Sequence, residues 1–206
     1  MSQFFHIHPD NPQGRLISQA VQIIRSGGII VYPTDSGYAI GCGLGEKKAM
    51  EKIIQIRNLD KKHDFTLVCK DLSEISVFAR VDNKAFRAIR AHTPGPFTFV
   101  FKGTKEVPKR ILNEKRKTIG MRVPNNKIAL ALLEELNEPL MSTSLLLPGD
   151  EFAESDPEEI RDKLEHQVDL IIHGGYLGEK PTSVIDFSED EPVVIRDGEG
   201  DVSLFV

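Results

Sequence analysis

The sequence has no tryptophan and only two cysteines, and no segment reaches the roughly 18 consecutive apolar residues of a membrane-spanning helix. Its first eight residues lack the basic start and apolar run of a secretory signal. Two cysteines are also too few for a disulfide framework. The six histidines are scattered, and none has a zinc-site spacing with a cysteine. We therefore expect a cytoplasmic protein with no membrane partner and no metal held by the protein alone.

Positive charge is in deficit overall, with 26 Lys and Arg against 31 Asp and Glu. This argues against a protein whose whole surface binds nucleic acid. Residues 102–117 are an exception, because they contain seven cationic side chains and two acidic ones. Two interpretations remain open for this basic stretch: a solvated loop, or a surface for an anionic partner such as structured RNA. In the second case, the expected contacts are Lys109, Arg110, Lys115, Arg116 and Lys117.

Apolar periodicities alternate along the chain between those of helices and those of buried strands. We expect helices over residues 14–26, 46–56, 83–92 and 128–136, and one that begins at 155–159. We expect strands over residues 29–32, 65–69, 97–101, 118–123, 140–143, 170–172, 184–186 and 193–196. Some strands follow one another directly, which favours a mixed sheet over a purely parallel one. The sequence thus predicts an α/β fold, with a twisted open mixed sheet and helices, in one domain over residues 10–200.

Two segments near residue 40 have both a functional and a structural interpretation. Residues 41–48 (GCGLGEKK) are either a loop that cradles phosphate before a helix or a glycine-rich strand passing close to other backbone. They lack the Lys-Ser/Thr pair of a P-loop. Residues 33–38 (PTDSGY) are either a ligand-binding strand end or a turn in which Asp35 and Ser36 bond their own backbone.

Other expected strands end in hydroxyl or guanidinium groups, which suit a carboxylate or phosphate ligand. They are residues 142–144 (STS), residues 182–183 (TS), Arg122 and Arg196. No Ser-His-Asp or Cys-His arrangement is convincing, and the apolar surroundings of both cysteines predict inert thiols.

Seven motifs, in this order, resemble the YrdC/TsaC family, nearest its YciO branch, over roughly residues 10–200. They are residues 33–41 (PTDSGYAIG), Arg57 with Lys61, and residues 94–98 (PGPFT), 118–124 (TIGMRVP), 142–144 (STS), 181–186 (PTSVID) and 195–198 (IRDG). The resemblance implies a YrdC-like fold with a large concave basic face. It also implies synthesis of threonylcarbamoyl-AMP from L-threonine, bicarbonate and ATP with Mg²⁺, releasing pyrophosphate, in a route to tRNA modification.

The resemblance also implies roles for individual residues. Thr34, Arg122, Ser142 and Thr182 fall on positions that contact threonine. Arg57, Lys61, Thr118, Ser144 and Arg196 fall on positions that contact the nucleotide, with Arg57 and Lys61 as the catalytic pair and Lys62 as the alternative to Lys61.

This chain departs from the family pattern at several positions, among them Asn58, where a proline usually follows the arginine. Gln55 stands where the family has a lysine, and Leu146 where it has an asparagine. A lost charge-assisted hydrogen bond costs about 1.5–3 kcal/mol, so synthesis is expected to be weak or lost. Three hypotheses follow: an enzyme that forms or hydrolyses threonylcarbamoyl-AMP, a double-stranded RNA-binding or ribosome-associated protein without efficient synthase activity, and a nucleotide binder without chemistry.

Overall fold

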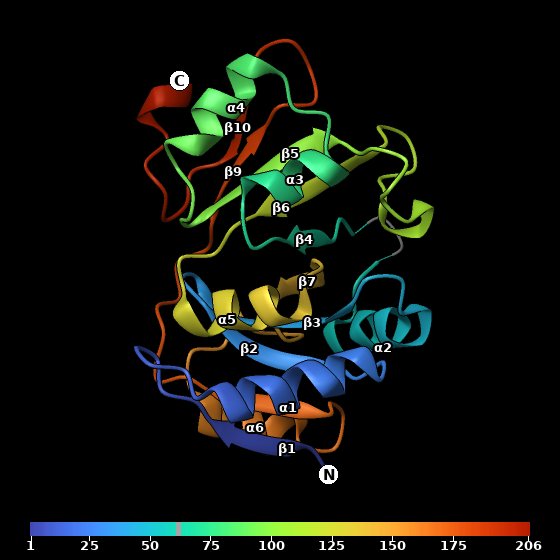
Figure 1. Cartoon of the computed structure of the whole chain (residues 1–206), viewed down its shortest axis with the longest axis vertical. Helices are drawn as coiled ribbons and strands as arrows, with labels where there is room; N and C mark the ends of the chain where they lie inside the picture. The colour runs from blue at the N-terminus through green and yellow to red at the C-terminus, as the bar shows by residue number, and fades with distance from the viewer. Residues whose placement is uncertain (61–62) are drawn as a thin grey trace.

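The computed structural model describes residues 1–60 and 63–206, and within them one continuous sheet has the strand order β1-β8-β2-β3-β7-β4-β6-β5-β9-β10 (Figure 1). The strands are β1 Gln3–His6, β2 Ile30–Thr34, β3 Gly37–Gly43, β4 Thr66–Val68, β5 Phe97–Lys102, β6 Thr118–Arg122, β7 Leu140–Ser144, β8 Leu170–His173, β9 Ser183–Asp186 and β10 Val193–Arg196. The helices are α1 Gly14–Arg25, α2 Lys47–Arg57, α3 Leu72–Phe78, α4 Asn83–Arg90, α5 Lys127–Leu136 and α6 Pro157–Leu164. Lys61 and Lys62 lie outside the described residues.

The sheet is mixed, as predicted. The pairs β1–β8, β2–β8, β4–β6 and β5–β9 are parallel, and the other neighbours are antiparallel. The end expected for the strand over residues 29–32 is wrong, because β2 continues through Pro33 to Thr34 and turns at Asp35 and Ser36 into β3. Strand β1, helix α3 and residues 37–40 of β3 were not expected from the sequence, whereas a strand was one of the two interpretations of residues 41–48. None of the helices described is long and apolar enough to span a membrane.

Local signals in the sequence explain where several helices begin and end. The Asp82 carboxylate accepts a hydrogen bond from the Ala85 amide at 2.7 Å and caps α4. Asp156 caps α6 in the same way, and Pro157 occupies its first turn. Helix α1 stops before Gly27, whose φ of +85° favours glycine.

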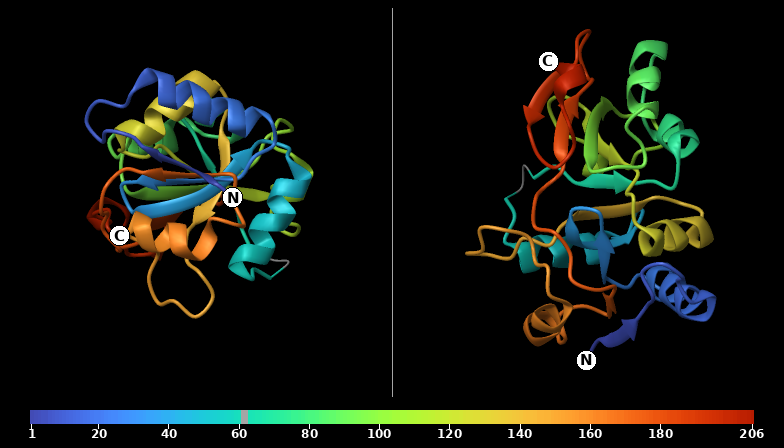
Figure 2. Two further views of the ribbon diagram at one scale, coloured as in Figure 1. Left: turned by 90° about the horizontal axis from the view of Figure 1, so that it is seen from below. Right: turned by 90° about the vertical axis from the view of Figure 1, so that its left-hand side faces the viewer.

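Helices α1 and α5 lie on one side of the sheet, and α2 and α6 lie on the other (Figure 2, left). Helices α1 and α5 pack on one face, against β2, β7 and β8. Helices α2, α3, α4 and α6 contribute to the cluster on the other face. Strands β4, β6, β5 and β9 form one half of the sheet. In this half, one face packs against the apolar cluster that includes α3 and α4, and the opposite face carries small polar residues.

Strict alternation along the strands produces this polar face. In β5, Phe97, Phe99 and Phe101 enter the apolar core, whereas Thr98 and Val100 point the other way. In β6, Ile119 and Met121 enter the core and alternate with Thr118, Gly120 and Arg122. The sheet thereby buries its aromatic side and leaves a hydroxyl-rich side for the site.

Candidate functional site

A cavity of about 650 Å³ opens on this polar face of the sheet. Thr66, Thr98, Thr118 and Thr182 line its sheet side. Its walls come from the end of α2, the end of β7, the loop before α6 and the end of β10. The volume is within the usual range for a small-molecule site.

Four of the five residues expected to contact nucleotide line this one cavity. They are Arg57, Thr118, Ser144 and Arg196, from α2, β6, β7 and β10. The fifth, Lys61, lies outside the described residues. The cavity thus brings together side chains that are up to 139 positions apart in the sequence, from Arg57 to Arg196.

Arg57 is held in place by the strand and loop opposite α2. Its Nε donates to the Leu146 carbonyl at 2.9 Å, and its Nη1 donates to the Thr143 hydroxyl. Burial lowers the pKa of Arg57 from its ordinary value, but an arginine remains charged at neutral pH. The contact with Leu146 uses the backbone, so the leucine at this position does not prevent it.

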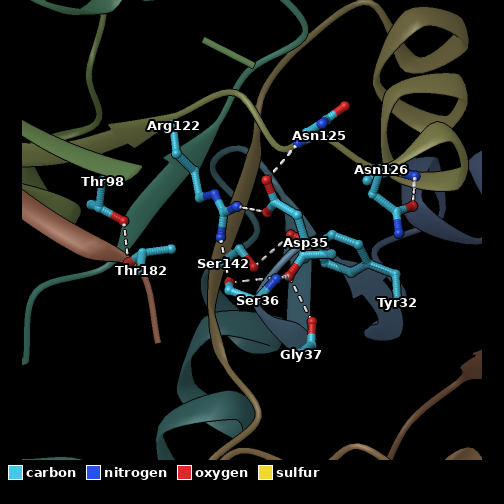
Figure 3. Close-up of polar contacts among 12 residues, drawn as sticks. Tyr32, Asp35, Ser36, Gly37, Thr98, Arg122, Asn125, Asn126, Ser142 and Thr182 are labelled. Atoms are coloured by element: carbon cyan, nitrogen blue, oxygen red, sulfur yellow. Dashed lines mark hydrogen bonds and ion pairs between the residues drawn. The ribbon is translucent and has the colours of Figure 1, made fainter. Parts of the chain in front are cut away.

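Arg196 and Thr182 form a second polar group on the cavity wall. Arg196 donates from Nε to the Thr182 carbonyl at 2.8 Å and from Nη2 to the Thr182 hydroxyl at 2.9 Å. The Thr182 hydroxyl also lies 2.9 Å from that of Thr98 (Figure 3). Burial lowers the pKa of Arg196 as well. Thr98 was not predicted as a site residue, although its alternation with buried phenylalanines signals an opposite-facing side chain.

The other residues expected to contact threonine gather behind Ser36, which lines the cavity. Arg122 donates to the Ser36 hydroxyl at 2.9 Å and forms an ion pair with Asp35 (Figure 3). Thr34 lies 3.3 Å from the same serine and donates to the Gly37 carbonyl at 2.6 Å. Thr34 and Arg122 are therefore buried and do not themselves line the cavity.

Ser142 is also buried, and its hydroxyl lies 2.7 Å from that of Tyr32 (Figure 3). Burial raises the pKa of Tyr32 to about 12, although the hydrogen bond with Ser142 and the charge of Arg122 act in the opposite direction. The phenol of Tyr32 is therefore neutral. It lies beside the group formed by Thr34, Asp35, Ser36 and Arg122, here called the Arg122 cluster, and it does not compete with Asp35 as an anionic partner of the guanidinium.

Arg122 has an unused donor. Its Nε is buried and has no hydrogen-bond partner among the described residues. A buried N–H without a partner is rare in native proteins and costs about 1–3 kcal/mol. The ion pair with Asp35 was not predicted from the sequence, because neighbouring turn residues such as Asp35 more often bond their own backbone.

The cavity wall is mixed in charge. Among the described lining residues, three arginines accompany four carboxylates, namely Asp64, Glu151, Glu179 and Asp186. Arg116, expected to contact RNA, lines this wall and forms an ion pair with Asp186 at 2.6 Å and a hydrogen bond with Ser188. The expected concave face is therefore present, but carboxylates outnumber arginines among its described lining residues, so the expectation that this face is basic is not met there.

The other residues expected to contact RNA lie near the 3₁₀ turn at Lys109–Ile111 and before β6. Lys109, Arg110, Lys115 and Lys117 are all exposed. None of the four forms an ion pair with any described residue.

The glycine-rich segment, residues 41–48, begins in a strand. Residues 37–43 form β3, which is buried along its whole length between β2 and β7. A side chain at Gly41 would bring its Cβ within 3.0 Å of the Met141 carbonyl. The strand interpretation is therefore confirmed for residues 41–43, where close backbone approach requires the glycine, whereas Lys47 and Lys48 begin α2.

No cluster of three or more His, Cys, Asp or Glu side chains that could hold a metal ion occurs in residues 1–60 and 63–206. The thiols lie in apolar surroundings, as expected. Burial raises the pKa of Cys42 to about 12 and raises that of Cys69 as well. Both thiols are therefore protonated at neutral pH.

Comparison with known proteins identifies the family. A family model described as "Telomere recombination" (Sua5_yciO_yrdC) matches residues 22–198. The chain is 68% identical to YciO of Escherichia coli (strain K12) over 206 residues, the full length of both proteins. A threonylcarbamoyl-AMP synthase of Coxiella burnetii is a more distant relative, 31% identical over 173 residues, which cover 82% of this chain and 91% of the synthase.

Solved structures agree with these sequence matches. The crystal structure of E. coli YciO has a TM-score of 0.97 to this chain and covers all of both chains. The structure of P. abyssi Sua5 complexed with L-threonine has a TM-score of 0.88 at 23% identity, over 96% of this chain and 58% of Sua5. The expected YrdC-like fold is confirmed. By its family match and its full-length identity with the E. coli protein, the chain belongs to the YrdC/Sua5 family, in the YciO branch.

Proposed function

We propose that this protein binds threonylcarbamoyl-AMP in the cavity and acts on it. It would either form this adenylate from ATP with Mg²⁺, L-threonine and bicarbonate, or hydrolyse it to AMP, L-threonine and bicarbonate. The observation that carries the proposal is the convergence of Arg57, Thr118, Ser144, Thr182 and Arg196 on one cavity wall. Hydroxyl and guanidinium donors aimed at one space are the groups that stabilise phosphate oxygens and developing negative charge.

The Arg122 cluster supports a threonine subsite next to the nucleotide. A ligand carboxylate would satisfy the buried Nε donor of Arg122, which lacks a partner in the described part of the chain. Ser36 connects this cluster to the cavity, since it both accepts from Arg122 and lines the cavity. The P. abyssi Sua5 structure is a complex with L-threonine, and we extend this ligand to the present chain.

The charge of the wall favours the adenylate over the triphosphate. The four carboxylates around the cavity repel a ligand with several negative charges more strongly than one with a single phosphate. Gln55, in place of the family's lysine, supplies no compensating cation. We therefore expect hydrolysis of threonylcarbamoyl-AMP to exceed its synthesis.

The test measures both directions with the purified full chain. In one assay the protein receives ATP, Mg²⁺, L-threonine and bicarbonate, and pyrophosphate and threonylcarbamoyl-AMP are quantified. In the other, threonylcarbamoyl-AMP is supplied, and its loss and the release of AMP are followed.

We expect measurable loss of the supplied adenylate, weaker synthesis, and a fall of about 10- to 100-fold or more in either activity for Arg57→Ala. Arg15→Ala removes an exposed arginine of α1 outside the cavity and should behave like the wild type. A well-folded wild-type chain with no turnover in either direction would contradict the proposal.

The second candidate function is binding of structured RNA by Lys109, Arg110, Lys115 and Lys117. Their exposure, without ion pairs to any described residue, favours it. It predicts an affinity for RNA that falls steeply with salt, with a smaller salt slope in a variant that neutralises these four residues. An affinity independent of salt would exclude this surface as the contact.

A further inference from the structure

The cavity contains a titratable side chain to which the proposed function assigns no role. His63 lies between α2 and β4, half-buried in the cavity wall. Its ring packs edge-on against Phe65, with centroids 5.6 Å apart at 86°. Its Nε2 lies 3.2 Å from the Thr143 hydroxyl, so two contacts fix the orientation of the ring.

The hydrogen bonds around Thr143 allow one ring nitrogen of His63 to remain free. Thr143 accepts a hydrogen bond from Arg57 and has a second lone pair for His63. We assign the proton of the neutral ring to Nε2, which then donates to Thr143. No described residue forms a hydrogen bond with Nδ1 of His63. The lone pair on Nδ1 can therefore accept a proton.

The charges near His63 favour its neutral form. Burial lowers the pKa of His63, and the positive charge of Arg57 lowers it further, whereas Asp64 and Asp60 on its own segment raise it less. In the described part of the chain, the other charged groups of the cavity wall are Arg116, Arg196, Glu151, Glu179 and Asp186. An imidazole that is neutral at physiological pH is able to act as a general base.

We propose that His63 is the general base that activates water for hydrolysis of threonylcarbamoyl-AMP. The inference rests on the proposed function. Water attacks the carbonyl carbon of the carbamoyl-phosphate anhydride while His63 removes one of its protons. The C–O bond to phosphate breaks, and its electron pair leaves with AMP. The carbonyl carbon keeps the hydroxyl, so the products are AMP and N-carboxy-threonine, and the proton held on His63 passes to solvent. N-carboxy-threonine then loses carbon dioxide to give L-threonine, and hydration of the carbon dioxide gives bicarbonate.

A base at this position serves hydrolysis more than synthesis. In synthesis, the attacking group is the carboxylate of N-carboxy-threonine, which is already anionic and has no proton to lose. Water has to lose a proton to become a hydroxide-like nucleophile. A histidine held beside the phosphate-binding Arg57 thus directs the site toward breakdown of the adenylate.

The experiment supplies threonylcarbamoyl-AMP to the full chain and compares His63→Gln with the wild type. Glutamine preserves a donor for Thr143 but cannot act as a base near neutral pH. We expect kcat for hydrolysis to fall by about 100-fold or more, with a much smaller change in KM. The ratio of adenylate formed to adenylate hydrolysed should rise. His166→Gln is the matched control, because the side chain of His166 is 71% exposed and outside the cavity.

Two further readouts separate a base from a structural residue. In the wild type, kcat/KM should rise with pH through a pKa below the ordinary value of histidine, and this limb should vanish in His63→Gln. Added imidazole should partly restore hydrolysis by His63→Gly. Thermal denaturation verifies that each variant is folded.

The outcomes for the two proposals differ. Hydrolysis by folded His63→Gln at the wild-type rate, or an unchanged pH profile, overturns the role of His63 and leaves the proposed function intact. A wild-type chain that turns over no adenylate in either direction overturns both.

Discussion

Replacement of Arg122 by alanine should destabilise the fold and weaken threonine binding together. The substitution leaves the Asp35 carboxylate without its ion-pair partner, and the two side chains are only 8% and 12% exposed. Loss of one partner of a buried pair costs about 3–5 kcal/mol. Asp35 keeps a hydrogen bond from the Asn125 amide at 2.8 Å, which places the cost at the lower end, at about 3 kcal/mol.

This cost can be measured by urea and thermal denaturation. For a chain of this length, a loss of about 3 kcal/mol lowers Tm by ~6–12 °C. The double variant Asp35→Ala/Arg122→Ala removes both charges, so its destabilisation should be smaller than the sum of the two single variants by about 0.5–3 kcal/mol. Arg15→Ala is the control for loss of an exposed arginine, with an expected change within ~0.5 kcal/mol.

Calorimetric titration with L-threonine provides the functional half of the test. Arg122→Ala should lose detectable affinity, because the proposed carboxylate partner is absent. The reasoning is refuted if Arg122→Ala unfolds at the wild-type temperature, or if it remains folded and binds threonine as tightly as the wild type does.

Two predictions concern groups elsewhere in the site and the core. Burial opposes ionisation of Asp186, but hydrogen bonds from Ser188 and Arg116 outweigh it and lower the pKa of Asp186. The ionised carboxylate therefore stabilises the fold above pH 3.8, and this stabilisation is lost as pH falls through the folded-state pKa. The free energy of unfolding, measured against pH, should show this loss in the wild type and not in Asp186→Asn. A disulfide reagent at pH 8 should leave Cys42 and Cys69 unmodified in the folded chain, and it should modify both cysteines after unfolding. Rapid reaction of the native protein would contradict the burial of these thiols.

The core strands and the helices with clear caps could be predicted from the sequence because local signals determine them. Alternation of apolar and small polar residues identified β5, and Asp82 and Asp156 marked the starts of α4 and α6. Helix α3 was missed because it is short, and β1 because only its pairing with β8 defines it.

The composition of the cavity wall could be predicted only in part. Strand-end hydroxyls and arginines are visible as motifs, and Thr118, Ser144, Thr182 and Arg196 do line one cavity. The pairing of Arg116 with Asp186 joins residues 70 positions apart and has no local signal. His63 likewise has no local signal, because its contact with Thr143 depends on the tertiary fold.

The net charge of −5 also has a structural explanation. Among the described residues of the cavity wall, four carboxylates accompany three arginines, and one of these arginines, Arg116, is paired with Asp186. This balance is suited to a ligand with one phosphate, and it gives a physical reason to expect adenylate handling in preference to triphosphate binding.

The most direct test of the account is equilibrium binding of a non-hydrolysable mimic of threonylcarbamoyl-AMP to the purified full chain. We predict one mimic bound per chain, displacement of both AMP and L-threonine by it, and strong weakening of its binding in Arg57→Ala. A mimic that fails to bind, or that displaces neither AMP nor L-threonine, would contradict the claim that the cavity is a site for this adenylate.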